Sequence, residues 1–285
     1  MRTLPDWLKK KLVCNDTAQA VHGLLSSCGL HTVCSSALCP NKGECFGRGT
    51  AAFLILGDTC TRKCGFCAVK KGLPSHMPDE SDVQKIISAV KAMKLLYAVI
   101  TSVTRDDLAD GGASHFYDVI AGLKRTFPYI KVEVLVPDFN GDMNALKEVV
   151  NACPDVLNHN LETVSSLYPT VRMGADYTRS LKVLQAADQS GACLTKSGIM
   201  LGLGESFAEV INTLEDLRSV GCSILTLGQY LRPSKNHLPV KKYISPHAFD
   251  RYKQIALNMG FNAVESGPFV RSSYKAKESF ERVIQ

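Results

Sequence analysis

From Ala51 onward, short apolar runs alternate with longer amphipathic segments along the chain. The runs have the length of β-strands, and continuous apolar runs are typical of parallel strands that are buried on both faces. They lie at 51–56, 97–103, 131–137, 156–161, 194–201 and 223–231, with a weaker one at 262–266. We therefore expect a parallel sheet whose strands are joined through helices.

The segments between these runs predict amphipathic helices. Segment 206–221 places Ser206 three residues before Glu209, the pattern of a capping box, and ends at Gly221. Segment 245–260 starts with Ser–Pro and ends with glycine, which also favours a helix. In segment 79–94 the apolar positions recur on one helical face; they are Val83, Ile86, Ile87 and Val90.

Six strand–helix units in series predict an α/β fold with right-handed crossovers. We expect a partial (β/α)6 barrel of the TIM type over residues 51–245. An N-terminal arm over residues 1–50 precedes it, and a C-terminal helix and extension over residues 246–285 follow it. A doubly wound open sheet is the alternative, although no G-x-G-x-x-G motif follows the first strand.

The N-terminal arm has a different pattern. Residues 18–28 predict one short helix that stops at Gly29. The following stretch, "CSSALCPNKGECFGRGTA", contains Pro, Asn and Gly and therefore predicts a loop.

Composition narrows the class of protein. The net charge is 33 − 27 = +6 without a long basic run, so we expect no nucleic acid partner. No apolar run is long enough for a membrane span, and the start of the chain lacks the apolar region of a signal peptide. We therefore expect a cytoplasmic protein, in which eleven cysteines indicate metal or redox chemistry rather than disulfides.

Three cysteines follow the first predicted strand directly. Cys60, Cys64 and Cys67 have the spacing C-x3-C-x2-C and lie on the first βα loop, where barrel enzymes place their chemistry. A fully ligated iron–sulfur cubane needs four thiolates, so three leave one iron open. An open metal position is where a substrate or cofactor binds. A zinc loop that takes a fourth ligand from elsewhere is the alternative.

A second triplet lies in the arm. Cys34, Cys39 and Cys45 have the spacing C-x4-C-x5-C. Two triplets can form two clusters that each lack one cysteine, or one zinc site with thiols to spare. Three further cysteines adjoin apolar runs or helix ends and are expected to be small buried side chains; they are Cys153, Cys193 and Cys222.

The first triplet, with Phe66 before its last cysteine, resembles the radical S-adenosylmethionine (SAM) superfamily. Both triplets together, with the motif R-S-S-Y at 271–274, resemble the lipoyl synthases within that superfamily. The resemblance runs from about residue 6 to 275 and includes "VITSVTRDDLADGGA", "NHNLE", "VRMGADY" and "TKSGIMLGLGE". One departure is Lys275, where the family pattern has His.

The resemblance implies two 4Fe–4S clusters and SAM as cofactors. Cys60, Cys64 and Cys67 would hold the cluster that binds and cleaves SAM. The auxiliary cluster would be held by Cys34, Cys39, Cys45 and, as its fourth ligand, Ser273. The glycine-rich turn and the polar strand ends would contact SAM together with the aromatic residue of the loop; these residues are Phe66, Gly111, Gly112, Asn158, Asn160, Glu162 and Lys196. His159 is expected to be a packed, structural residue.

The implied reaction inserts two sulfur atoms, at C6 and C8 of an octanoyl chain carried by a lysine of a lipoyl carrier domain. Those carbons are unactivated, so a radical must remove each hydrogen atom and the cofactor must supply it. The auxiliary cluster would donate the sulfur. Implied partners are the E2 subunits of 2-oxoacid dehydrogenases, the glycine cleavage H protein, and reduced ferredoxin or flavodoxin as electron donor. Arg232 and Lys235 are expected to help dock an acidic carrier domain.

Other functions remain as alternatives. Biotin synthase or a methylthiotransferase uses related chemistry, but the R-S-S-Y motif and the order of the triplets argue against both. A ferredoxin-like electron carrier would be expected to have fully ligated clusters. A zinc-binding interaction module is the third alternative.

Overall fold

One sheet of eight strands dominates the computed structural model, which describes residues 4–10 and 15–285. The strand order is β1-β2-β5-β6-β7-β8-β9-β10. The strands are β1 (His31–Thr32), β2 (Ala52–Ile55), β5 (Tyr97–Ser102), β6 (Lys131–Leu135), β7 (Val156–Asn158), β8 (Leu194–Leu201), β9 (Ile224–Gln229) and β10 (Ala263–Gly267). A separate pair consists of β3 (Thr59–Cys60) and β4 (Lys70–Lys71).

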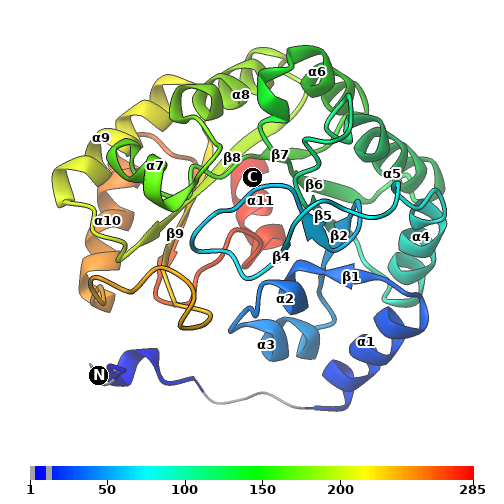
Figure 1. Cartoon of the computed structure of the whole chain (residues 1–285), viewed down its shortest axis with the longest axis horizontal. Helices are drawn as coiled ribbons and strands as arrows, with labels where there is room; N and C mark the ends of the chain where they lie inside the picture. The colour runs from blue at the N-terminus through cyan, green and yellow to red at the C-terminus, as the bar shows by residue number, and fades with distance from the viewer. Residues whose placement is uncertain (1–3, 11–14) are drawn as a thin grey trace.

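The sheet forms an open barrel. Strands β2 to β10 of the large sheet run parallel, and β1 is antiparallel to β2 at one edge. The edge strands β1 and β10 stand at opposite ends of the strand order, and the sheet curves between them around a central space (Figure 1). The predicted partial barrel is thus confirmed, with β10 as a seventh parallel strand.

The major helices form a ring outside the barrel (Figure 1). They are α4 (Asp82–Ala92), α5 (Ala113–Thr126), α6 (Met143–Asn151), α8 (Tyr177–Gln189), α9 (Phe207–Ser219) and α10 (Pro246–Asn258), with a short α7 (Tyr168–Val171) before α8. The capping box of α9 is confirmed, because Ser206 and Glu209 each bind the backbone N–H of the other. No helix in the described part of the chain is long and apolar enough to cross a membrane.

The main apolar core lies between the strands and this ring of helices. Phe116 and Leu123 of α5 pack with Ile100 of β5 in one cluster, and Leu214 of α9 packs with Leu225 of β9 in another. All five side chains are fully buried. Because burial of such a side chain stabilises the fold by about 1.5–3 kcal/mol, this layer holds the strands and frees the inner face for polar groups.

The N-terminal arm is more helical than its sequence predicts. It contains η1 (Asp6–Leu8), α1 (Asp16–Ser27), α2 (Val33–Ser36) and α3 (Lys42–Gly47). The prediction of a loop after residue 33 is therefore wrong for α2 and α3. The Thr32 side chain accepts from the Ser35 N–H and caps α2. Leu38, with φ of 51°, then turns the chain before α3 begins.

The C-terminal helix α11 (Ala276–Ile284) covers the amino-terminal end of the barrel. The Phe280 ring lies 5.7 Å from the ring of Tyr97, the first residue of β5. The same ring lies 5.6 Å from Nζ of Lys131, the first residue of β6. Figure 1 shows α11 in the middle of the ring of strands. The end of the barrel opposite the βα loops is thus partly closed by the chain itself.

Candidate active site

A cavity of about 810 Å³ lies inside the open barrel. Its lining includes residues beyond the carboxyl ends of the strands, such as Arg232, and residues before their amino ends, such as Leu96. The cavity is lined by all six cysteines of the two triplets, Cys34, Cys39, Cys45, Cys60, Cys64 and Cys67, and by Ser273. Residues from both ends of the chain therefore meet at one internal space.

The loop that carries the first triplet is held by backbone hydrogen bonds on both sides. The Gly65 N–H donates to the Val171 carbonyl at 2.9 Å, and the Leu238 N–H donates to the Gly65 carbonyl at 3.1 Å. Nε2 of His237 lies 3.0 Å from the carbonyl oxygen of Cys67. The loop that follows β2 is thus anchored to the segments after β7 and β9, on the carboxyl-end rim of the barrel.

The second triplet lies toward the opposite end of β2. Because β1 runs antiparallel to β2, with Thr32 opposite Phe53, the chain enters α2 near the amino end of β2. Cys34 is on α2, Cys45 is on α3 and Cys39 lies between them. The four residues of β2 span roughly 10 Å at about 3.3 Å per residue. The two triplets therefore face one cavity from separate positions along a single strand.

Two hydrogen bonds join the C-terminal segment to the arm. The Tyr274 hydroxyl donates to Oε1 of Glu44 at 3.0 Å, and the Asn41 amide donates to the Phe269 carbonyl at 2.6 Å. These contacts bring Ser273 to the cavity beside the second triplet. Glu44 also pairs with Lys10 at 2.7 Å, and the hydrogen bond from Lys10 is the main cause that lowers the pKa of Glu44.

The two serines of the R-S-S-Y motif have different surroundings. The Ser272 hydroxyl accepts from Nδ2 of Asn158 at 2.6 Å and donates to Oδ1 of Asn160 at 3.0 Å. In the described part of the chain, the Ser273 hydroxyl has no hydrogen-bond partner, and this residue lines the cavity. Ser273 therefore has a free oxygen for a metal, whereas Ser272 does not.

Burial disfavours the thiolate form of three of the six cysteines in the triplets. Burial raises the pKa of Cys34 to about 11 and the pKa of Cys45 and Cys67 to about 12. These thiols are neutral at pH 7 without metal, and iron binding must release their protons. Among the described residues, no three His, Cys, Asp or Glu side chains converge as ligands of one metal ion. A cubane needs a wider arrangement, since each thiolate binds a different iron.

The predicted SAM-binding residues divide into two groups. Phe66, Asn160 and Glu162 line the cavity. The other four stand apart from the cavity lining; they are Gly111, Gly112, Asn158 and Lys196. The two glycines precede α5 with positive φ, and a Cβ on Gly112 would lie 2.3 Å from the Leu56 side chain. Close packing thus accounts for glycine at position 112.

Asn158 and Lys196 belong to a buried polar network on the inner face of the sheet. Nζ of Lys196 lies 2.8 and 3.1 Å from the two carboxylate oxygens of Glu133. The Tyr97 hydroxyl donates to the same carboxylate at 2.8 Å, and Nδ2 of Asn158 lies 3.3 Å from it. Glu133 on β6 and Lys196 on β8, the two strands that flank β7, thus neutralise each other's charge in a buried position.

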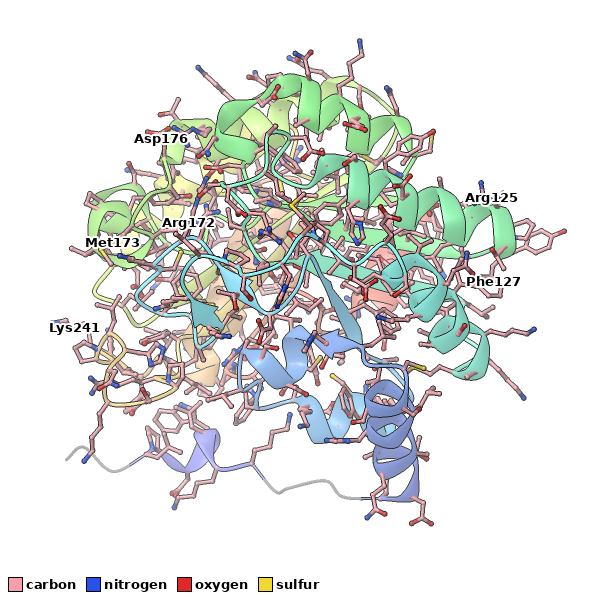
Figure 2. The ribbon with its side chains drawn as sticks, turned by 45° about the vertical axis from the view of Figure 1, so that its right-hand side comes forward. Arg125, Phe127, Arg172, Met173, Asp176 and Lys241 are labelled. Atoms are coloured by element: carbon pink, nitrogen blue, oxygen red, sulfur yellow. The ribbon has the colours of Figure 1, made fainter. Side chains whose placement is uncertain are left out.

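Arg172 is a residue of the cavity wall that sequence reasoning did not single out. It follows α7, is labelled in Figure 2, and donates to the Tyr168 hydroxyl at 2.9 Å and to Ser180 at 3.0 Å. Burial raises the pKa of the Glu162 carboxyl, and the charge of Arg172 opposes that rise. The "VRMGADY" stretch of the family resemblance was the available signal for this arginine.

Comparison with known proteins places the chain in a family. A sequence model described as the radical SAM superfamily matches residues 54–217. Lipoyl synthase from Caldicellulosiruptor saccharolyticus is 55% identical over 276 residues, which cover 96% of each chain. The chain belongs to the lipoyl synthase family. Lipoyl synthase from Trichlorobacter lovleyi is 56% identical over 95% of this chain and 96% of the relative. Lipoyl synthase from Chlorobaculum parvum is 52% identical over 98% of this chain and 95% of the relative.

Solved structures show the same fold at low sequence identity. Methylornithine synthase (PylB) matches with a TM-score of 0.56 and 15% identity over 87% of this chain and 81% of that chain. The FeFe-hydrogenase maturase HydG from Carboxydothermus hydrogenoformans matches with a TM-score of 0.60 and 14% identity. The match covers 80% of this chain and 55% of that chain. The open barrel is therefore the architecture of this lipoyl synthase family member.

Proposed function

We propose that the chain catalyses the formation of the lipoyl group by inserting two sulfur atoms, at C6 and C8 of a protein-bound octanoyl chain. One observation carries this proposal: two cysteine triplets and Ser273 line a single cavity from separate positions. A reaction that generates a carbon radical and then traps it with sulfur needs both centres within reach of one substrate. Membership of the lipoyl synthase family supports the same conclusion.

The first triplet would hold a 4Fe–4S cluster together with SAM. Cys60, Cys64 and Cys67 supply three thiolates, so the fourth iron is free for the amino and carboxylate groups of the SAM methionine. When bound, this pair of cofactors supplies the radical that removes a hydrogen atom. Asn160 and Glu162 on the cavity wall would orient the polar groups of SAM beside that site.

The second triplet would hold the auxiliary cluster that provides sulfur. Cys34, Cys39 and Cys45 would bind three irons, and the Ser273 hydroxyl, which has no hydrogen-bond partner among the described residues, would bind the fourth. Oxygen is a harder ligand than sulfur and suits iron less well than thiolate does. Ser273 would therefore hold the cluster less firmly than the three thiolates do, which suits a cluster that has to give up sulfur.

The apolar part of the cavity wall suits an eight-carbon chain. Side chains from β2, β5, β6 and β8 contribute Leu54, Val99, Leu135 and Ile199 to it. Each methylene that such a wall covers stabilises binding by about 0.8 kcal/mol. The same wall excludes water from the carbons that react.

The carrier protein must approach the rim of the cavity, because its lysine bears the octanoyl chain. Arg232 lines this cavity, and its guanidinium donates to the carbonyls of His237 and Lys235. The loop 232–237 would thus present basic groups to an acidic carrier domain. Carrier domains of 2-oxoacid dehydrogenase E2 subunits and the glycine cleavage H protein would be the substrates. Reduced ferredoxin or flavodoxin would supply the electrons.

Iron and acid-labile sulfide counts after anaerobic reconstitution test the proposal. The wild type should hold about eight irons, at four per cubane. The variants Cys60→Ala/Cys64→Ala/Cys67→Ala and Cys34→Ala/Cys39→Ala/Cys45→Ala should each retain about four. SAM cleavage should be lost only in the first variant. A single cluster or bound zinc in the wild type would exclude the two-cluster reaction.

A further inference from the structure

The Ser272 hydroxyl links the C-terminal segment to the inner face of the barrel. It accepts from Nδ2 of Asn158 at 2.6 Å and donates to Oδ1 of Asn160 at 3.0 Å, across 114 and 112 positions of the chain. In the described part of the chain, these are the side-chain hydrogen bonds that join segment 270–275 to the barrel strands and the residues just after them. A backbone bond adds to them, because the Val270 N–H donates to the carbonyl of Gly267 at the end of β10 at 3.1 Å. Both asparagines are buried.

Each asparagine is itself held by a second partner. Nδ2 of Asn158 is 3.3 Å from the carboxylate of Glu133, which Lys196 neutralises. Nδ2 of Asn160 donates to Glu162 at 3.0 Å, so its Oδ1 is the atom left to face Ser272. The hydroxyl of Ser272 thus meets one donor and one acceptor whose orientations are already set by the barrel.

The position of Ser272 determines the position of Ser273, since consecutive Cα atoms are about 3.8 Å apart. A ligand has to reach its metal within a few tenths of an ångström, and supporting groups that fix ligands change metal affinity by about 10- to 100-fold. Within the part of the chain that the structure describes, no hydrogen bond fixes the Ser273 hydroxyl. Its placement must come from the neighbouring residue and from Tyr274, which holds the arm.

We propose that Asn158, Ser272 and Asn160 form a serine latch that positions the Ser273 hydroxyl at the auxiliary cluster. The three are positioning residues, because they act through Ser273 rather than on iron. This inference rests on the proposed function, in which Ser273 binds that cluster. It also assigns Asn158 a task at the auxiliary site, whereas the sequence predicts that it contacts SAM.

The test uses the full chain with the changes Cys60→Ala/Cys64→Ala/Cys67→Ala, so that all iron signals come from the auxiliary site. Into this background Ser272→Ala, Ser273→Ala and both together are introduced. The rate of iron loss to a chelator and the Mössbauer spectrum of the cluster are measured. Neither readout requires activity.

The latch predicts non-additive effects, as expected for residues that act as one unit. Ser272→Ala should speed iron loss by about tenfold or more, and the double variant should lose iron no faster than Ser273→Ala. The spectrum of Ser272→Ala should lose the oxygen-ligated iron subsite. Asn158→Leu removes the hydrogen bond between Asn158 and Ser272 from the barrel side. It should therefore change iron loss and the spectrum in the same way as Ser272→Ala.

Thr195→Val is the matched control. Thr195 is fully buried on β8, and its hydroxyl donates to the Gly221 carbonyl at 2.9 Å. Among the described residues, this hydroxyl makes no hydrogen bond to the C-terminal segment. Iron loss in this control should match the background. If Ser272→Ala and Asn158→Leu behave like Thr195→Val, or if the two serine changes add, the latch is refuted. A background variant with no iron would instead refute the proposed auxiliary cluster, so the two failures are distinct.

Discussion

The ammonium group of Lys196 lies 2.8 Å from Oε1 of Glu133, and both side chains are almost completely buried. Removing one member of such a pair leaves an uncompensated charge, which costs about 3–5 kcal/mol. We expect Lys196→Met to lower the free energy of unfolding by that amount in urea titrations. The double variant Lys196→Met/Glu133→Leu should recover most of the loss, because no charge is then left alone.

An ion pair whose lysine is about half exposed provides the comparison for this prediction. Lys131 pairs with Asp155 at 3.0 Å, and the lysine side chain is 47% exposed. Pairs of this kind contribute about 0–1 kcal/mol. Equal losses for Lys131→Met and Lys196→Met would show that water reaches the inner pair.

His159 should remain neutral and should make the fold sensitive to acid. Its Nδ1 lies 2.8 Å from the Val136 carbonyl and its Nε2 lies 3.4 Å from the Arg172 guanidinium, so Nδ1 carries the proton and Nε2 accepts. Burial, reinforced by the charge of Arg172, lowers the pKa of His159 to about 3. The unfolded chain takes up this proton near pH 6.5, and the folded chain takes it up only near pH 3.

The contribution of His159 to stability is therefore complete above pH 6.5 and is lost as the pH falls toward 3. Urea titrations across this window should show a slope of about 1.4 kcal/mol per pH unit from this group. His159→Gln should remove that slope, and His22→Gln on the exposed face of α1 should leave it in place. An unchanged slope in His159→Gln would mean that other groups cause the acid sensitivity.

Tyr274→Phe should loosen the arm. The change removes the 3.0 Å hydrogen bond to Glu44, and a bond to a partly exposed carboxylate contributes about 1 kcal/mol. Amide hydrogen exchange in α3 should become about fivefold faster, the factor that corresponds to this free energy. Tyr129→Phe, at a ring that is 90% exposed, is the control. Equal exchange rates in both variants would show that the hydrogen bond between Tyr274 and Glu44 does not stabilise the arm.

Gly65→Ala should displace the loop of the first cysteine triplet, because the new methyl group would clash with Leu238. A Cβ at this position would lie 2.9 Å from Cδ1 and Cγ of Leu238, so the loop between Cys64 and Cys67 has to shift. We expect SAM cleavage to fall about tenfold or more, since small displacements of reacting groups are costly. Gly23→Ala, which meets nothing within 4 Å, should have no such effect.

A second variant separates crowding from other causes. Leu238→Ala makes room for the new methyl group, so Gly65→Ala/Leu238→Ala should recover part of the SAM cleavage that Gly65→Ala loses. If the double variant is no better than Gly65→Ala alone, the contact with Leu238 does not determine the loop position.

Much of the barrel could be predicted because local patterns and fold agree there. The seven apolar runs correspond to the seven parallel strands, and the predicted cap at Ser206 forms. The first triplet was placed correctly in the segment after β2, since its cysteines begin four residues after the apolar run; Cys60 itself ends the short strand β3. The order of strands and helices thus positions that part of the site.

The proposed auxiliary site depends on contacts that no local sequence pattern contains. α2 and α3 are four and six residues long, too short for a helical period to appear in the sequence. The different surroundings of Ser272 and Ser273 arise only when the last part of the chain enters the barrel. Arg172 likewise acquires its place from the packing of Tyr168 and Ser180 around it.

The hydrogen bond between Glu44 and Tyr274 joins residues that are 230 positions apart, and it has a consequence for synthesis. The last thiol of the arm's triplet, Cys45, is translated 228 positions before Ser273, the serine that would complete the site. During translation the arm offers three thiols without the fourth ligand. Stable loading of the proposed auxiliary cluster should therefore follow the synthesis of Ser273, and nascent chains that end before this serine should carry iron at the site only transiently.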